Sequence, residues 1–181
     1  MYYDRAAVEN AFKANELQNF LFFWGHQPSK DGKITSSCLS QWWQSAFEVD
    51  GVVYRTAEHW MMVHKARLFG DDETATKILA AESPKQVKQL GREARGFDAA
   101  RWDARKLAVV QDGNFHKFSQ NVDLRDYLLA TGDRVLVEAS PVDPVWGIGL
   151  AADNPDAADP SLWKGDNLLG FALMHARERL R

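Results

Sequence analysis

The stretch 56–70, TAEHWMMVHKARLFG, has apolar residues at positions that surround nearly the whole circumference of a helix. A helix that is apolar on almost all sides is normally buried, so this pattern predicts a buried helix. Thr56 suits its N-cap, and Gly70 suits the C′ position that ends a helix. The same stretch carries Glu58 and Lys65. Because buried ionisable groups must be paired or functional, the helix is the first candidate for a site.

Glu58 and Lys65 lie on one stripe of this helix, together with Met62 and Phe69. They are two turns apart, roughly 10 Å along the axis, which is too far for an i, i+4 ion pair. This separation suits two contacts with one ligand. Simpler interpretations are that Glu58 complements the helix dipole and that Lys65 extends its ammonium group to solvent. A desolvated lysine would instead have a lowered pKa and could attack a sugar aldehyde or imine.

Elsewhere the pattern predicts further helices and a few short strands. Helices are expected over 4–18, 73–82, 84–95, 98–116, 123–130 and 167–180. Strands are expected over 20–24 and 134–139, with a hairpin over 47–55 that turns at Asp50-Gly51, and 39–47 could also be extended. Loops are expected over 26–37 and 140–150, and 151–165 should form a surface loop or lid. The predicted fold class is α+β, predominantly helical, in a single compact domain with a small β element.

The composition is that of an ordinary globular domain, with 45% hydrophobic and 26% charged residues among 181. The net charge of −3 argues against general binding to phosphate backbones, although a local basic patch stays possible. The single cysteine, Cys38, excludes an internal disulfide. The N-terminus lacks a signal-peptide layout, and no apolar run is long enough to cross a membrane. We therefore expect a soluble, cytoplasmic protein.

The loop 138–150, EASPVDPVWGIGL, is the second candidate for a site. Gly147 and Gly149 would let the backbone approach a ligand closely, while Asp143 supplies a carboxylate and Trp146 a stacking face. The simpler interpretation is a Pro/Gly loop with a capping Asp and a packed Trp. No dinucleotide-binding fingerprint is present, because the third glycine and the following helix are missing.

Two further patterns bear on chemistry. The five histidines are scattered, without the spacing of a zinc site, so no metal is expected. A basic stripe, consisting of Lys85, Lys88, Arg92 and Arg95, runs along the predicted helix 84–95. We interpret this stripe first as the solvated face of an amphipathic helix. The alternative is a platform for phosphates or nucleic acid.

Several motifs in this order resemble the YbiA-like family, also called NADAR (NAD- and ADP-ribose-associated). They are FFWG at 22–25, LSQWW at 39–43, F-x-x-x-G-x-x-Y-x-T-A-E-H-W-M-M at 47–62, KARLFGD at 65–71, LGR at 90–92, Trp102 followed by Arg105 and Lys106, GN-x-x-KF-x-QN at 113–121, LVEASPVDPVWGIGL at 136–150 and W-x-G-x-NLLG-x-ALM at 163–174. The resemblance covers nearly the whole chain after residue 20. It implies a YbiA-like domain over 20–181, with residues 1–19 as an N-terminal extension packed on it.

The resemblance implies N-glycosidase chemistry without a cofactor. Family substrates are the phosphorylated ribosylamino-pyrimidine intermediates of riboflavin biosynthesis or, in other branches, ADP-ribose attached to guanine in DNA. By position in the motifs, Glu58, Lys65 and Asp143 match catalytic residues. The positions that would bind substrate are Trp24, Gly25, Trp102, Arg105, Trp146, Gly147 and Lys164. The expected partner is thus a small phosphorylated ribosyl substrate, with ADP-ribosylated DNA as the alternative and no membrane.

Two mechanisms and three functions are compatible with these residues. The two carboxylates could stabilise positive charge at C1′ and deliver a proton to the leaving nitrogen. Alternatively, neutral Lys65 could displace the amine from an opened ribosylamine and form a Schiff base that water then cleaves. The functions are a glycosidase of riboflavin intermediates, a hydrolase of ADP-ribosylated guanine, and a non-catalytic reader of ADP-ribose or NAD.

Overall fold

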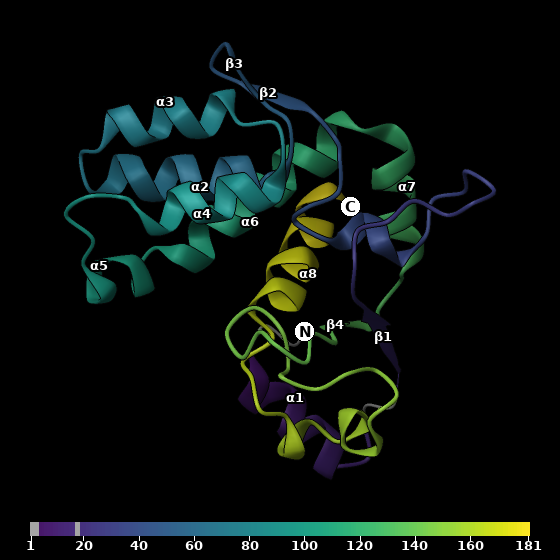
Figure 1. Ribbon diagram of the computed structural model, residues 1–181. Coiled ribbons are helices and arrows are strands. Elements are labelled where there is room, and N and C mark those ends of the chain that lie inside the picture. The colour runs from purple at the N-terminus through teal and green to yellow at the C-terminus, as the bar shows by residue number, and fades with distance from the viewer. Residues whose placement is uncertain (1–3, 17–18) are drawn as a thin grey trace. The chain divides into compact units, whose positions relative to one another are not determined.

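The computed structural model describes residues 4–16 and 19–181 and groups the chain into two compact units (Figure 1). One unit combines the N-terminal residues to Ser40 with Asp123–Arg181, and the other consists of Gln41–Val122. The predominantly helical α+β class predicted from the sequence is confirmed. Among the described residues, the β structure consists of two small two-stranded sheets, one in each unit. Within the same residues, no helix has the length and apolar character that crossing a bilayer requires.

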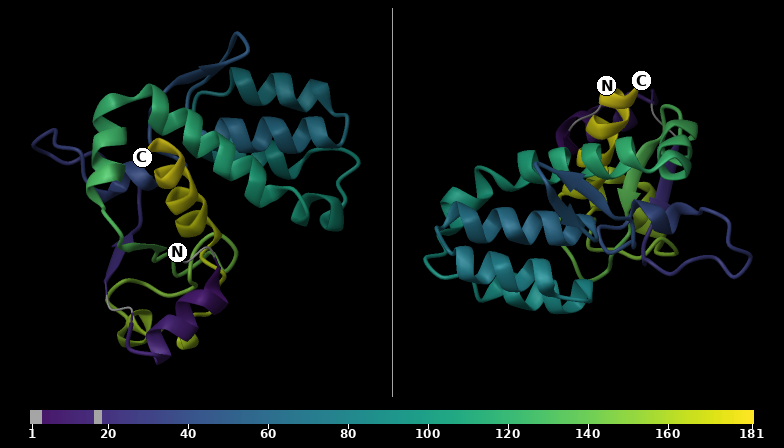
Figure 2. Two further views of the ribbon diagram at one scale, coloured as in Figure 1. Left: turned by 180° about the vertical axis from the view of Figure 1, so that it is seen from behind. Right: turned by 90° about the horizontal axis from the view of Figure 1, so that it is seen from above.

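The unit Gln41–Val122 is a hairpin followed by helices. Its elements are β2 (Phe47–Val49), β3 (Val52–Tyr54), α2 (Ala57–Leu68), α3 (Asp72–Ala80), α4 (Pro84–Arg92), α5 (Ala99–Asp103) and α6 (Lys106–Gln120). Helices α3, α4 and α6 all pack against α2, and the views in Figures 1 and 2 show this arrangement. Helix α2 is therefore the central element of this unit.

The hairpin forms where the sequence predicts it. Phe47 pairs with Tyr54 in an antiparallel register, and the two rings stack with centroids 5.7 Å apart. Asp50 and Gly51 turn the chain with φ of 51° and 75°. Positive φ at both central residues matches the twist of the strands, which is why Asp-Gly favours this two-residue turn.

The predicted buried helix is confirmed as α2. The Thr56 side chain accepts a hydrogen bond from the His59 N–H (3.4 Å), which caps the first turn. Gly70, with φ of 73°, lets the chain leave the helix, and the Asp71 N–H returns to the Ala66 carbonyl (3.0 Å). This left-handed glycine ends the helix as expected. The residues from Ala57 to Val63 are all buried, because neighbouring helices cover most of the circumference.

Two sequence predictions for this part of the chain are wrong. The helix expected over 98–116 is broken into α5 and α6, because Arg105 has φ of −120° and lies outside both helices. The segment 39–47, which could have been extended, is not a strand. It begins in a short 3-10 helix, η1 (Ser36–Leu39), and reaches β structure only at Phe47. Further along, the Gln41 carbonyl accepts the Glu58 N–H (3.0 Å), a tertiary bond that local sequence pattern does not encode.

The other unit surrounds a parallel strand pair. Its remaining elements are α1 (Arg5–Lys13), β1 (Phe20–Phe23), α7 (Val122–Ala130, which starts at the boundary), β4 (Val135–Glu138), two 3-10 helices, η2 (Pro155–Ala158) and η3 (Pro160–Leu162), and α8 (Leu168–Leu180). Strand β4 pairs with β1 in parallel. Val135, Leu136 and Val137 are all fully buried, so this strand is covered on both faces.

Helix α8 lies directly on β4. A Cβ atom on Gly170 would stand 2.0 Å from the Leu136 carbonyl oxygen, so only glycine allows this approach. Asn167 precedes the helix in a left-handed conformation (φ 55°). Its side chain accepts from the Glu138 N–H and donates to the Leu136 carbonyl, both at 2.9 Å. The Asn167 amide thus continues the ladder of β4 and fixes where α8 begins.

The N-terminal helix α1 packs against η3. The Arg5 guanidinium donates to the Gly165 carbonyl (3.4 Å), and the Phe12 ring lies 6.3 Å from that of Phe20. The helix predicted over 4–18 therefore forms but is shorter, and residues 17–18 fall outside the described part of the chain. The extension proposed over 1–19 likewise includes residues 1–3, which are not described.

Candidate active site

Glu58 occupies the first turn of α2 and is only 5% exposed. Its N–H donates to the Gln41 carbonyl (3.0 Å), and the Gln41 side chain donates to Asn114 of α6 (3.0 Å). Asn114, fully buried, donates in turn to the Val110 carbonyl (2.8 Å). A chain of buried amides thus ties the start of α2 to α6. This chain fixes the backbone from which the Glu58 carboxylate projects.

Lys65 lies two turns further along α2 in an aromatic environment. Its Nζ is 4.5 Å from the centroid of the Phe97 ring and 5.9 Å from that of Trp102. Among the described residues, no carboxylate lies within ion-pair distance of this ammonium group. Burial and the positive charge of Arg92 lower the pKa of Lys65, and the negative charge of Glu58 partly opposes them. Lys65 is half-buried, so its amine is partly desolvated rather than fully extended into solvent.

The close approach of α4 to α2 explains how Arg92 acts on Lys65. A Cβ atom on Gly91 would stand 2.1 Å from the sulfur of Met62, which lies between Glu58 and Lys65 on the same stripe. Glycine at this position lets the two helices touch. The next residue, Arg92, is exposed, and its field reaches the Lys65 amine.

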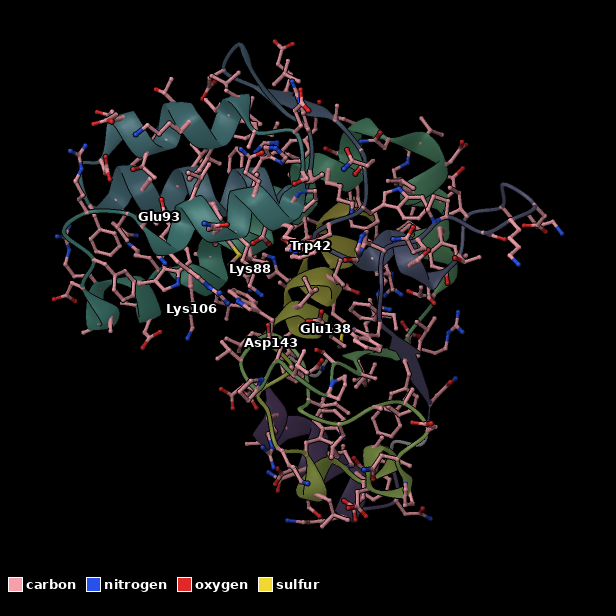
Figure 3. The ribbon with its side chains drawn as sticks, in the orientation of Figure 1. Trp42, Lys88, Glu93, Lys106, Glu138 and Asp143 are labelled. Carbon is pink, nitrogen blue, oxygen red and sulfur yellow. The ribbon has the colours of Figure 1, made fainter. Side chains whose placement is uncertain are left out.

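The basic stripe predicted on helix 84–95 does not behave as one patch, because α4 ends at Arg92 and Arg95 lies beyond it. The Arg95 guanidinium pairs with Asp71 (2.7 Å) and Glu73 (3.0 Å), so its charge is neutralised locally. These contacts hold the pKa of Asp71 well below its usual range. Lys88 instead lies 6.0 Å from the Trp42 ring centroid, and Figure 3 labels both side chains. Lys85 and Arg92 are exposed.

In the other unit, Asp143 shapes the loop that carries Trp146. The Asp143 side chain accepts from the N–H groups of Val145 (3.0 Å) and Trp146 (2.8 Å). This is the capping role given above as the simpler interpretation. One carboxylate oxygen makes both bonds, and Trp146 is half-buried. Figure 3 labels Asp143 and also Glu138, the last residue of β4.

The glycines of this loop are explained by packing. A Cβ atom on Gly147 would stand 2.8 Å from the Glu138 carbonyl oxygen, and one on Gly165 would stand 2.3 Å from the Gly147 carbonyl oxygen. The Lys164 N–H donates to the Ile148 carbonyl (2.8 Å). Two segments far apart in sequence therefore form one tight layer, in which Lys164 leaves its side chain exposed.

The remaining predicted substrate-binding residues are exposed or turn-forming. Trp24 follows β1 and is 59% exposed, and Gly25 has φ of 80°. Arg105 is exposed at the start of α6, and its N–H donates to the carbonyl of the buried Trp102 (2.9 Å). Trp102 and Arg105 are the predicted substrate-binding residues that belong to the unit Gln41–Val122. Of these two, Trp102 has its ring near the Lys65 amine.

Three residues at the site escaped the sequence reasoning. Phe97 lies over Lys65, while Gln41 and Asn114 support the start of α2. Phe97 stands between Gly96 and Asp98. A large apolar residue in a loop of this kind is a signal in the sequence that its side chain has a role in packing or binding. Gln41 and Asn114 lie within the resembling motifs, but a buried amide pair is visible only after folding. No three His, Cys, Asp or Glu residues in the described chain form a metal-binding group.

Comparisons with known proteins place the chain in a family by sequence and by fold. Residues 22–181 match the model of the NADAR domain. The chain is 41% identical over 168 residues to N-glycosidase R617 of Acanthamoeba polyphaga mimivirus, covering 90% of this chain and 97% of the relative. It is 32% identical over 133 residues to N-glycosidase YbiA of Escherichia coli, covering 74% of each. The NMR structure of E. coli YbiA superposes with a TM-score of 0.71 and 27% identity, over 91% of this chain and 86% of that one.

Proposed function

Because this chain belongs to the NADAR family and, like its curated relatives, hydrolyses an N-glycosidic bond, we propose that its substrate is a phosphorylated ribosylamino-pyrimidine of riboflavin biosynthesis. The bond cleaved joins C1′ of the ribose to the amino nitrogen of the pyrimidine. A charged metabolite of this kind does not cross membranes freely, which is consistent with a cytoplasmic location for the enzyme.

The observation that carries the proposal is the environment of Lys65. Its amine lies against two aromatic rings, its pKa is lowered by burial and by Arg92, and it lies on the same helical stripe as the buried Glu58. A lysine with a lowered pKa is a competent nucleophile toward an imine. A ribosylamine opens to such an imine, so the site fits this substrate class.

The proposed reaction proceeds through a Schiff base. The neutral Lys65 amine adds to C1′ of the opened substrate imine. A proton transfers to the substrate nitrogen, and the aminopyrimidine leaves as a free amine. The C1′=Nζ iminium then adds water, and the resulting carbinolamine releases the ribose aldehyde and restores Lys65. Glu58 moves the protons in these steps, and Asp143 is proposed as a second proton-transfer group because of its motif.

The charge distribution supports a small substrate. The protein carries a net charge of −3, and Arg95 of the basic stripe is already paired with Asp71 and Glu73. Binding along a DNA backbone requires several available cations. One observation favours the alternative substrate, ADP-ribosylated guanine in DNA: Lys85 and Arg92 are exposed on the same helix. Two cations could contact a diphosphate or a short stretch of backbone.

Turnover on both substrates, measured side by side, tests the proposal. We expect release of free aminopyrimidine from the ribosylamino substrate and little release from ADP-ribosylated DNA. Faster release from DNA, with affinity that falls steeply as salt rises, would favour the alternative. Tight binding without any release would indicate a non-catalytic reader.

Borohydride trapping tests the mechanism. We expect reduction during turnover to leave a covalent sugar on Lys65, and Lys65→Arg to remove both the adduct and activity. Lys77→Arg is the matched control, because Lys77 lies on neighbouring α3 in an exposed pair with Glu73 (2.7 Å). Full activity in Lys65→Arg would reject the Schiff base and leave the two carboxylates as the catalytic groups.

A further inference from the structure

Phe97 is an exposed aromatic side chain placed directly beside the proposed nucleophile. It is 48% exposed, although its ring packs edge-on against Phe69 with centroids 5.4 Å apart. Gly96, with φ of 69°, turns the loop so that this ring lies over the C-terminal half of α2. Leaving this apolar surface exposed has an energetic cost. The contact of the Phe97 ring with the Lys65 ammonium suggests that the ring stabilises a positive charge there.

We propose that Phe97 is a further catalytic residue, whose ring stabilises the positive charge on Lys65 Nζ in the iminium intermediate as it does in the resting ammonium. Trp102 supplies a second, more distant face at 5.9 Å. Aromatic faces attract cations without accepting a proton, so they stabilise the charge while leaving the proton transfers to the carboxylates. This inference rests on the Schiff-base route proposed above.

The charges around Lys65 show why such a group is useful. Arg92 on α4 opposes a cation at Nζ, and Glu58, two turns away on α2, is the carboxylate that favours one. A lowered pKa provides the neutral amine that attacks, but the same environment destabilises the iminium that follows. The Phe97 ring offsets this cost at the reacting atom. It acts at 4.5 Å, where no carboxylate in the described chain lies within ion-pair distance.

The Phe97 ring is proposed to stabilise both the ammonium and the iminium form of Lys65. Its removal should therefore affect the amount of adduct in a way that depends on pH. Below the pKa of Lys65, the enzyme starts as an ammonium and ends as an iminium, so loss of the ring affects both states and the effects cancel. Above this pKa, the enzyme starts as a neutral amine, so loss of the ring affects only the iminium. Removing the ring should therefore lower the amount of adduct above the pKa of Lys65 and leave it unchanged below. General structural damage would lower it at every pH.

The test uses ribose 5-phosphate as the probe, with cyanoborohydride to reduce the iminium and intact mass to quantify it. The wild type is compared with Phe97→Leu, which keeps apolar volume, and Phe97→Tyr, which keeps a ring. We expect Phe97→Leu to lose roughly three- to tenfold of the adduct above the pKa of Lys65, with Phe97→Tyr close to the wild type. Val53→Ala, another exposed apolar position in the same unit, serves as the control.

The outcomes separate this inference from the proposed function. Equal labelling of Phe97→Leu and wild type at every pH, or a uniform loss at every pH, would overturn the role of Phe97 alone. Absence of any adduct in a wild-type enzyme that releases base would overturn the Schiff base and this inference together. Ring-dependent labelling of Lys65 in an enzyme that releases no aminopyrimidine would support the inference while rejecting the proposed substrate.

Discussion

Gly91 of α4 lies so close to Met62 of α2 that a Cβ atom on Gly91 would stand 2.1 Å from the Met62 sulfur and 3.2 Å from its Cβ. The second distance matters because the Met62 Cβ cannot move away without shifting α2 itself. The contact therefore sets the spacing of the two helices. Arg92, the next residue, is one of the charges that lower the pKa of Lys65.

Gly91→Ala should therefore force the two helices apart. We expect a loss of about 1–3 kcal/mol in the free energy of unfolding, the usual range for overpacking a well-packed core. Activity should fall as well, because Lys65 and Glu58 flank Met62 on the stripe. Urea unfolding measures the first effect. Gln89→Ala on the exposed face of the same helix is the control, and equal stability of the two variants would contradict this account.

Arg92→Gln should move the pH dependence of activity in a defined direction. The positive charge of Arg92 disfavours the ammonium form and so lowers the pKa of Lys65. Removing this charge raises that pKa, so less neutral amine is present at a given pH. The acidic limb of the pH–rate profile should therefore shift to higher pH at low salt. The shift should shrink at high salt, because Arg92 is exposed.

Lys85→Gln is the matched control for this experiment. It removes the same charge from an exposed position of the same helix, but Lys85 is not among the charges that act on Lys65. A pH profile identical to that of the wild type is expected. If Lys85→Gln and Arg92→Gln shift the profile equally, the effect reflects net charge rather than proximity.

Asp143→Asn and Glu58→Gln should each reduce turnover by about 100-fold or more without unfolding the protein. Asparagine keeps a side-chain oxygen for the Val145 and Trp146 N–H groups, so the loop can retain its turn while the negative charge is lost. Asp143→Ala removes the turn as well and should also lower thermal stability. Near-normal rates in Asp143→Asn and Glu58→Gln would show that the candidate site is misplaced.

Asn114→Ala should impair turnover although Asn114 is assigned no contact with the substrate. The change leaves the buried Gln41 side chain without its acceptor and loosens the segment that holds the Glu58 N–H. An unsatisfied buried group costs about 1–3 kcal/mol. We expect kcat to fall more than KM changes, since a displaced carboxylate affects the chemical step.

Gln120→Ala controls for the loss of an amide from α6. Like Asn114, Gln120 joins α6 to another segment: its side chain bonds the backbone N–H and carbonyl of Glu48 (2.9 and 2.8 Å). Unlike Asn114, Gln120 is exposed, and its contacts are with β2. It should lose some stability with kcat retained. A kcat in Asn114→Ala equal to that of Gln120→Ala would indicate a purely structural role for Asn114.

Much of the local structure followed from the sequence because its causes are local. The Thr56 cap, the Gly70 ending and the Asp50-Gly51 turn each depend on the conformations open to one or two residues. The sequence does not reveal the break between α5 and α6, because its helical periodicity continues across Arg105. The segment 39–47 is rich in aromatic residues, which favour strands, but here tertiary contacts determine the path of the chain.

The same distinction between local and tertiary causes applies to the candidate site. The sequence by itself determined that Glu58 and Lys65 share one stripe of a buried helix, since 3.6-residue periodicity requires it. Only the tertiary structure decided what surrounds them. Phe97 reaches Lys65 from 32 positions away in the chain, and Gln41 and Asn114, 73 positions apart, meet behind Glu58. Because the pKa of an amine depends on burial and on charges brought near by folding, the character of Lys65 is a property of the folded chain.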